Sequence, residues 1–342
     1  MPDLAGVRIA ITGGAGFVGS HLVELLAAQR SQVLIIDDLS SCGTRNIEHL
    51  LGRDEIVLEQ ADVRDATAMM TLLKGCNFVF HLATRNVRLS LKRPTEIHEI
   101  NTSGTLNVLK AASAAKAKRF LYCSSSEVNG TAGVVPMAED YAYNPETIYG
   151  ASKLTGEYYT QVFQKSGWLD TVIARPHNTY GPREHFHGHF GEVIPRFILF
   201  ALAGKPPIIF GDGVQTRDFT FVTETADFLA RLGLHPALGG ETFNICRGAE
   251  VSILEIAAVI CRLTGLQTEP MFLPARPNDV RRLWGDPSRL IAALGEGPKI
   301  DIEQGLSETV DWFRREVRID ESVIASLDPR NWAEVKPEPW LE

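Results

Sequence analysis

Two short stretches of the chain hold the side chains best suited to move a proton. Tyr149 and Lys153 stand four residues apart in an amphipathic helical segment, so both lie on one face of that helix. A tyrosine ionises at about pH 10 and is a poor base at neutral pH unless a nearby ammonium, here that of Lys153, stabilises its phenolate. Ser125 follows an expected strand and can hydrogen-bond the same substrate oxygen. These three side chains predict removal of a hydroxyl proton while a hydride leaves the adjoining carbon.

An isolated Tyr-x-x-x-Lys pair has a simpler explanation, in which the tyrosine packs and the lysine is solvated. A glycine motif upstream favours the catalytic interpretation. Residues 12–19, Thr-Gly-Gly-Ala-Gly-Phe-Val-Gly, follow an expected strand and open a helix. Such glycines permit a tight turn and let a pyrophosphate approach the helix N-terminus, although a tight turn without a ligand is the alternative. The residues expected to contact a dinucleotide here are Gly13, Gly16, Phe17 and Val18.

The end of the second expected strand indicates which dinucleotide binds. Asp37 lies near the spacing at which a carboxylate binds the adenosine ribose hydroxyls. Because this carboxylate would repel a 2′-phosphate, the cofactor is predicted to be NAD rather than NADP. Asp38 is interpreted as a solvated turn residue.

The elements that must position these residues alternate between short apolar runs and helical stretches. Such runs are typical of strands buried on both faces, and they predict an α/β fold with a Rossmann-type, doubly wound parallel sheet. We expect an NAD-binding domain over 1–176, to which later segments can return, a smaller substrate-binding lobe over 177–316 and an extended C-terminal tail on the surface over 317–342. The expected strands are 7–12, 32–37, 55–59, 77–82, 118–124 and 171–174, and the lobe is expected to include 219–222, 242–246 and helices over 252–263 and 302–315.

Composition excludes several classes of partner. The chain has 342 residues and a net charge of −8 without a basic block, which argues against nucleic-acid binding. Its start lacks the features of a signal peptide and no apolar run approaches a membrane span, so no membrane partner is expected. The 5 cysteines are scattered without a Cys-x-x-Cys pair, which is typical of reduced thiols and a cytoplasmic protein. The histidine-rich stretch 177–189 lacks the further ligands of a closed site, so no metal is expected.

Five further motifs accompany the glycines, Asp37, Tyr149 and Lys153. They are Ala-Asp-Val-Arg-Asp at 61–65, His-Leu-Ala at 81–83, Asn-Thr-Ser-Gly-Thr at 101–105, Ser-Ser-Ser-Glu-Val at 124–128 and Arg-Pro-His-Asn-Thr-Tyr-Gly-Pro-Arg at 175–183. In this order they resemble the extended short-chain dehydrogenase/reductases that modify nucleotide-diphosphate sugars, over residues 7 to 315. The resemblance implies that Ser125, Tyr149 and Lys153 act at the sugar C4 hydroxyl, that Asp62 and Val63 lie beside the adenine, and that the protein is a homodimer.

The resemblance extends to the substrate. It implies that Asn178, Arg217 and Arg281 hold the diphosphate, and arginines suit this because they bind phosphate oxygens in a fork. Ser126 and His177 match positions close to the sugar, although the family usually has phenylalanine or tyrosine at the latter. The stretch 83–90 is one residue shorter than its counterpart and carries two arginines. Arg85 and Arg88 are equally compatible with an exposed loop face and with contact to an anionic group of the substrate.

Glu127 bears on the fate of the 4-keto sugar. A carboxylate at this strand end could take the C5 proton, which favours 4,6-dehydration slightly over 4-epimerisation. Arg276 with Glu127 keeps decarboxylation of a C6 carboxylate open. A buried glutamate that only caps backbone amides is the alternative role. A protein that binds NAD without catalysis is the alternative function, and the intact Ser125, Tyr149 and Lys153 argue against it.

Overall fold

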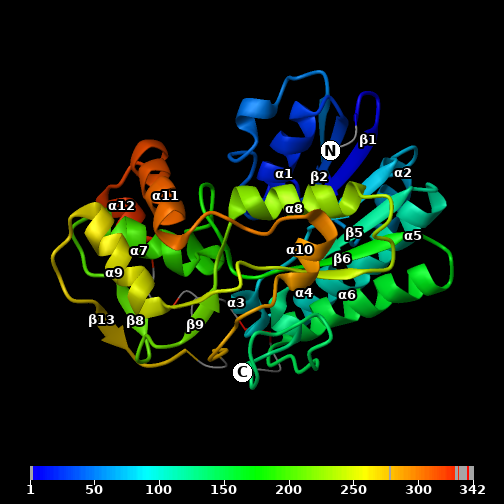
Figure 1. Cartoon of the computed structure of the whole chain (residues 1–342). Coiled ribbons are helices and arrows are strands. Elements are labelled where there is room, and N and C mark those ends of the chain that lie inside the picture. The colour runs from blue at the N-terminus through cyan, green and yellow to red at the C-terminus, as the bar shows by residue number, and fades with distance from the viewer. Residues whose placement is uncertain (1–2, 277–278, 328–329, 331–336, 339–342) are drawn as a thin grey trace.

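The computed structural model describes residues 3–276, 279–327, 330 and 337–338, apart from the side chain of His189. A seven-stranded parallel sheet forms one side of the molecule and a smaller lobe the other (Figure 1). The strand order is β11-β6-β5-β4-β1-β2-β3, so the chain reverses direction across the sheet on either side of β1. This order is that of a doubly wound fold, and the predicted fold class is confirmed. The strands are β1 (Arg8–Thr12), β2 (Gln32–Asp37), β3 (Ile56–Gln60), β4 (Phe78–His81), β5 (Arg119–Cys123), β6 (Thr171–Pro176) and β11 (Thr242–Ile245).

Helices cover both faces of the sheet, which explains the continuous apolar runs. In β1, Ile9 and Ile11 point to one core while Ala10 points to the other, as the two-residue period of a strand requires. One face carries α1 (Phe17–Ala28), α8 (Val222–Leu234) and α10 (Ser288–Leu294). The other carries α2 (Ala66–Leu72), α5 (Thr105–Ala114) and α6 (Ile148–Lys165). Short elements in the connections are η1 (Glu48–Leu50), α3 (Val87–Ser90), α4 (Pro94–Ile97), the π-helix η2 (His98–Gly104) and η3 (Ser126–Val128).

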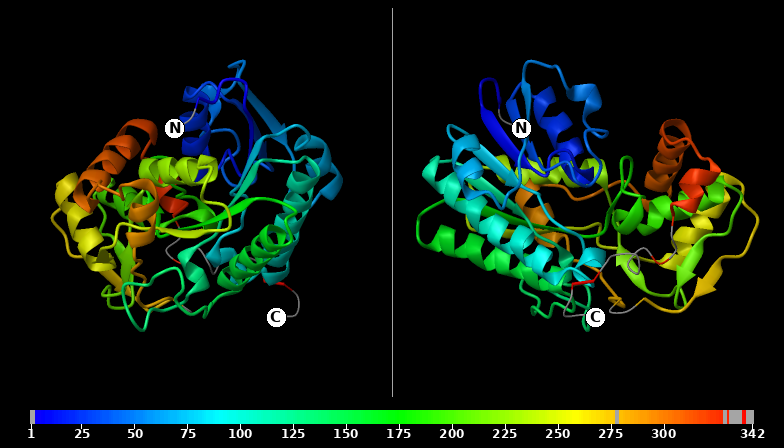
Figure 2. Two further views of the ribbon diagram at one scale, coloured as in Figure 1. Left: turned by 45° about the vertical axis from the view of Figure 1, so that its right-hand side comes forward. Right: turned by 180° about the vertical axis from the view of Figure 1, so that it is seen from behind.

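The smaller lobe has its own apolar core, in which α7, α9 and α11 pack together. Its helices are η4 (Gly188–Phe190), α7 (Val193–Leu202), α9 (Ile253–Thr264), α11 (Ile302–Glu316) and α12 (Glu321–Ala325). Its strands form two-stranded sheets and are β7 (Thr179–Tyr180), β8 (Ile208–Phe210), β9 (Thr216–Asp218), β10 (Thr220–Phe221), β12 (Glu250–Ser252) and β13 (Met271–Leu273). The two further views in Figure 2 show the lobe beside the carboxyl ends of the sheet strands.

Two segments differ from the sequence-based expectation. Residues 242–245 were expected in the lobe, but they form β11, which pairs with β6 and completes the sheet edge. The strand is short and follows a turn, so the sequence does not show which sheet it joins. The C-terminal tail was expected to be extended, but part of it is α12, whose Ile324 packs on the lobe core. The tail residues Trp332 and Trp340 lie outside the described residues. The part of the chain that the structure describes has no helix that is long and apolar enough to span a bilayer.

Candidate active site

The loop after β1 is shaped by its glycines. Gly13 has a φ of +73°, and a Cβ there would lie 2.7 Å from the backbone nitrogen of Ala83. A Cβ on Gly19 would lie 2.1 Å from the carbonyl oxygen of Gly13, so α1 can sit this close to the loop only with glycine at that position. Gly16 precedes α1 without a side-chain cap, which leaves the first backbone amides of the helix for a ligand. The loop therefore fits a pyrophosphate.

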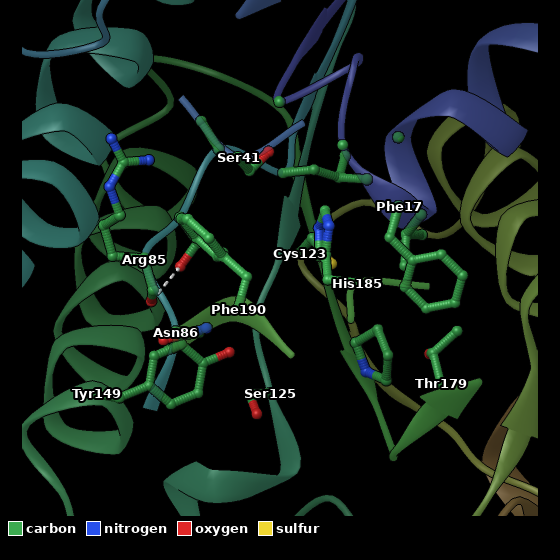
Figure 3. A pocket seen from close by; sticks show the side chains of 18 of the residues that line it. Phe17, Ser41, Arg85, Asn86, Cys123, Ser125, Tyr149, Thr179, His185 and Phe190 are labelled. Atoms are coloured by element: carbon green, nitrogen blue, oxygen red, sulfur yellow. Dashed lines mark hydrogen bonds between the residues drawn. The ribbon is translucent and has the colours of Figure 1, made fainter. Parts of the chain in front are cut away.

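A cavity of about 370 Å³ runs from this loop to the ends of β4 and β5 (Figure 3). It is lined by most of the residues predicted from the sequence, although these come from distant parts of the chain. The predicted residues along it are Gly13, Gly16, Phe17, Val18, Asp37, Asp62, Val63, Arg85, Ser125, Ser126, Glu127, Tyr149, Lys153 and Asn178.

Asp37 closes β2 at one end of this cavity. Its two carboxylate oxygens accept hydrogen bonds from the backbone amides of Ala15 and Leu39, at 3.0 and 2.9 Å. Burial raises the pKa of Asp37 above its usual range, and these two amides oppose the shift. The carboxylate thus links the glycine loop to the end of β2, where it can also accept hydrogen bonds from the ribose hydroxyls of a dinucleotide.

Arg85 and Asp38 form an ion pair that the sequence did not predict. The Arg85 guanidinium donates to Asp38 at 2.7 Å and to Glu96 at 3.4 Å, and only 12% of its side chain is exposed. Arg85 therefore faces the cofactor end of the cavity rather than an exposed loop surface. Asp38 does belong to a turn, because its Oδ1 accepts hydrogen bonds from the backbone amide and the hydroxyl of Ser40. It is not only solvated, since its Oδ2 pairs with Arg85, which comes from a connection 47 residues away and could not be predicted from the sequence.

Tyr149 and Lys153 lie on one face of α6, as their spacing predicts. Lys153 Nζ donates to the carbonyl oxygen of Cys123 at 2.8 Å, which holds the ammonium at the end of β5. Burial lowers the pKa of Lys153 to about 8. Burial also raises the pKa of Tyr149 above its ordinary value, and a hydrogen bond with Ser125 opposes this rise. The phenol is therefore close to a hydroxyl and one helical turn from a cation, and both groups can stabilise its phenolate.

The carboxyl group of Glu127 is enclosed where η3 begins after β5. Its Oε2 is buried without a hydrogen-bond partner. Burial raises the pKa of Glu127, and the positive charges of Arg217 and Arg276 oppose the rise. The backbone amide of Glu127 donates to Ser125 Oγ at 3.2 Å, which orients the Ser125 hydroxyl. A buried carboxyl with a raised pKa is a stronger base when ionised than an ordinary carboxylate, and such groups are typical of functional sites.

A second cavity of about 150 Å³ continues from the first into the smaller lobe. Asn178 and Glu127 line both cavities, whereas Arg217 and Arg276 line the second. The two guanidinium groups share one carboxylate oxygen of Asp279, at 2.9 and 2.5 Å. This places two arginines beside a cavity large enough for part of a nucleotide.

The structure does not bring two predicted substrate residues to either cavity. His177 is buried behind β6, where its backbone amide donates to Ile245 and a Cβ on Gly285 would lie 2.6 Å from its ring. Burial lowers the pKa of His177 to about 3. Arg281 lies on the surface in a two-pronged pair with Asp212, at 2.9 Å for both bonds. Both predictions placed a motif residue by its neighbours in sequence, but a strand turns successive side chains to opposite faces, and a loop can turn its side chains to the surface.

Several cavity residues were missed. Glu184, His185, Phe190 and Glu192 line the first cavity. The first two lie in the histidine-rich stretch 177–189, where no metal is expected, and the other two follow it. The His185 ring lies 6.4 Å from the Phe17 ring and 5.7 Å from the Phe190 ring, measured between centroids. Figure 3 shows these aromatic side chains around the cavity that holds Tyr149 and Ser125. Two acidic residues at the ends of a stretch rich in glycine and aromatic residues were the available signal.

The residues that the structure describes include no group of three or more histidine, cysteine and acidic side chains that could hold a metal. All five cysteines lie in that part of the chain and are free.

Comparison with known proteins decides the family. The model of the NAD dependent epimerase/dehydratase family matches residues 9–246. This chain belongs to that family. A UDP-glucose 4-epimerase of Mycolicibacterium smegmatis is 36% identical over 312 residues, covering 90% of this chain and 99% of the relative. A UDP-glucuronic acid decarboxylase 1 of Xenopus tropicalis is 33% identical, covering 91% and 73%.

The solved structures agree with the family. DesIV, a dTDP-glucose 4,6-dehydratase from Streptomyces venezuelae solved with NAD and TYD bound, superposes with a TM-score of 0.87 at 26% identity. The superposition covers 93% of this chain and 100% of that one. The chain is an NAD-dependent enzyme of nucleotide sugars, and the predicted family and cofactor are confirmed. Among the residues predicted to contact this cofactor, the glycine loop, Asp37, Asp62 and Val63 line the first cavity.

Proposed function

We propose that the enzyme is a nucleotide-diphosphate hexose 4,6-dehydratase. Oxidation at C4 is followed by loss of the C5 proton and the C6 hydroxyl as water. The observation that carries this proposal is the buried Glu127 carboxyl, whose free oxygen lies where the two cavities meet.

The first step uses the side chains at the ends of β5 and α6. Tyr149 acts as the base in its phenolate form, which the Lys153 ammonium and the Ser125 hydroxyl stabilise. The phenolate takes the C4 hydroxyl proton and becomes the phenol, while Ser125 hydrogen-bonds the same substrate oxygen. Bound NAD would supply a reversible hydride acceptor, which takes the hydride from C4 and gives it to C6 after water has left while C5 gains a proton, so no external oxidant or reductant is consumed. Lys153 is buried, whereas Ser125 and Tyr149 are partly exposed along the cavity, where a substrate can reach them.

The second step uses Glu127. A ketone at C4 makes the C5 proton acidic, and the Glu127 carboxylate removes it. The same carboxyl then gives that proton to the departing C6 hydroxyl, so one side chain acts as base and then as acid. Its raised pKa favours both roles, because the carboxylate becomes a stronger base and the carboxyl keeps its proton at higher pH than an exposed glutamate does. Ser126 stands between Ser125 and Glu127, at a position where some dehydratases use an aspartic acid as the acid. Because the Glu127 carboxyl would serve as both base and acid, elimination by this chain does not require that aspartic acid.

Decarboxylation is the second candidate, and a specific observation supports it. Arg217 and Arg276 lie close enough to Glu127 to oppose its pKa shift, so a C6 carboxylate could find a cation there. The relatives named decarboxylases are in keeping with this route. In 4-epimerisation the hydride would return to the other face of C4, and Glu127 would remove no proton. This is the reaction named for the M. smegmatis relative.

Product analysis separates these routes. The enzyme is incubated with uridine and thymidine diphosphate hexoses and hexuronates, and the products are identified by mass and NMR. A 4-keto-6-deoxy sugar is the expected product, with solvent exchange at C5 that is lost in Glu127→Gln. Wild-type exchange and turnover in this variant would exclude Glu127 as the base and move the assignment to an epimerase.

We also infer that the enzyme is a homodimer through α5 and α6. The outer surface of α6 exposes Ile148, Tyr158 and Val162, each about half accessible. Apolar side chains spaced along one helix are typical of a helical interface. Light scattering should give twice the chain mass, and Tyr158→Glu with Val162→Glu should give the monomer. A monomeric wild-type protein would contradict the inference.

A further inference from the structure

The junction of the two cavities is where a sugar must lie if NAD fills the first cavity and a nucleotide the second. Two acidic side chains, Glu127 and Glu192, reach this junction. The residues that line both cavities are Val87, Glu127, Asn178, Glu192, Val193 and Phe219. Only one of the two carboxylates has a role in the steps described above.

Glu192 is held in place by a buried arginine. Arg88 Nη1 donates to Glu192 Oε2 at 3.1 Å, and its Nη2 donates to the other carboxylate oxygen and to the carbonyl of Phe190, the latter at 3.1 Å. The Arg88 side chain is 7% exposed, whereas that of Glu192 is 38% exposed. A two-pronged pair of this kind restricts the carboxylate to one orientation.

The ion pair is asymmetric toward the site. Glu192 lines both cavities, whereas Arg88 lines only the second. The face that the pair presents to the cofactor cavity is therefore the carboxylate. Besides burial, the charge of Glu192 raises the pKa of Tyr149, so Glu192 lies within electrostatic reach of the side chain whose phenolate takes the C4 proton.

The other charges around the junction do not remove this negative face. Arg217 and Arg276 share Asp279 in the second cavity. Arg196 also lines the second cavity, and these three arginines do not line the cofactor cavity. Burial raises the pKa of Glu127, and raises that of Glu184 well above its usual value, so the negative face presented by Glu192 does not depend on either group. A carboxylate accepts hydrogen bonds from sugar hydroxyls, but it repels a second carboxylate in a site of low dielectric constant.

We propose that Glu192, oriented by Arg88, is a specificity residue that accepts hydrogen bonds from an uncharged hexose and rejects a hexuronic acid. The inference rests on the proposed function in that a nucleotide sugar occupies the junction. It narrows the substrate class to sugars with an uncharged C6 substituent, and it thereby disfavours decarboxylation by this chain.

Binding tests the inference apart from the reaction. The NAD-loaded Tyr149→Phe variant, in which turnover is blocked, is titrated calorimetrically with UDP-glucose and with UDP-glucuronate. The nucleotide is the same in both ligands, so the affinity ratio reports only the C6 group. If the nucleotide cavity rejects uridine, the matching thymidine diphosphate pair is used.

We expect UDP-glucose to bind at least about tenfold more tightly, because a like charge is penalised at this position. Adding Glu192→Gln should reduce the ratio to less than about threefold, mostly through tighter uronate binding. Glu192→Asp keeps the charge and should keep the preference. Glu250→Gln is the matched control, because this carboxylate pairs with Arg282 and lines neither cavity, and its ratio should not change.

Equal or tighter binding of the uronate by the parent, or an unchanged ratio in Glu192→Gln, overturns the inference. Circular dichroism of each variant shows that the fold is retained, and Glu192→Asp provides the answer if the glutamine variant unfolds. A normal ratio with a 4-epimer as product would leave the inference standing and contradict only the proposed dehydration.

Discussion

The sheet end and the smaller lobe contribute to the same site in different ways. At the sheet end, the functional side chains lie on regular elements or on the loop that directly follows a strand, and they are held by backbone groups, as Lys153 is by Cys123 and Asp37 is by Ala15 and Leu39. In the lobe, the charged side chains come from short strands and loops and are held by one another, as Arg217 and Arg276 are by Asp279. The first arrangement determines positions through secondary structure. The second depends on pairing between distant segments, so residues that are close in one sequence motif, such as Arg276 and Arg281, can lie in different surroundings.

The strongest way to break this comparison is to remove the phenol at the sheet end. Tyr149→Phe should lower kcat by about 10²- to 10⁴-fold, the range typical of a general base, and leave nucleotide-sugar affinity within a few-fold. Steady-state kinetics and calorimetry measure the two quantities. An unchanged kcat would exclude the mechanism and favour a protein that binds NAD without catalysis.

A charged side chain of the lobe should affect binding instead. Arg217→Ala should weaken binding of a free nucleoside diphosphate by about 1.5–3 kcal/mol, or roughly 10- to 150-fold, because a phosphate oxygen loses a charge-assisted partner. NAD content should change less. Normal diphosphate affinity in calorimetry would make Arg217 only a partner of Asp279.

Asp37 tests the cofactor end of the sheet. Asp37→Asn should narrow the preference for NAD over NADP by about 1–3 kcal/mol, because the repulsion of a 2′-phosphate is lost. Asp38→Asn is the matched control, since that carboxylate already pairs with Arg85 and should change the preference less. Fluorescence titration with both cofactors gives the ratio, and a wild-type preference for NADP would show that Asp37 is misassigned.

The dependence of kcat/KM on pH should report the deprotonation of the Lys153 ammonium. Because burial lowers its pKa to about 8, the charge is present below that pH and is lost above it. We expect kcat/KM to fall by up to about tenfold per pH unit above pH 8, as phenolate stabilisation disappears. Ser125→Ala should lower kcat without moving this midpoint. A flat profile through pH 9 would show that the ammonium is retained or is not needed.

The smallest effect is expected at Arg281. Its side chain and that of Asp212 are each more than half exposed, and exposed pairs contribute little. Arg281→Ala should therefore change diphosphate affinity by less than about twofold, in contrast with Arg217→Ala. A loss as large as that of Arg217 would mean that the segment around Arg281 reorganises when substrate binds.

The extent of sequence-based prediction follows the same division. Periodicity within one element placed Tyr149 and Lys153 together, and apolar runs placed six strands in a parallel sheet, because both depend on local geometry. Pairing between segments was not predictable. Nothing in the sequence shows that Arg88 pairs with Glu192 across 104 positions, that His177 turns into the core, or that β11 returns to the sheet edge.

The route of β11 bears on how this protein can be engineered. After β6 the chain enters the lobe through α7, returns to the sheet side for α8 and β11, enters the lobe again for α9, and returns once more for α10 before α11. No single cut in the sequence separates the two halves of the site. A chimaera that joins the N-terminal half of this chain to the C-terminal half of a relative would also exchange an edge strand and two sheet-packing helices. Transplanting substrate preference therefore requires replacing individual loops, since recombination at one crossover would mismatch the shared core.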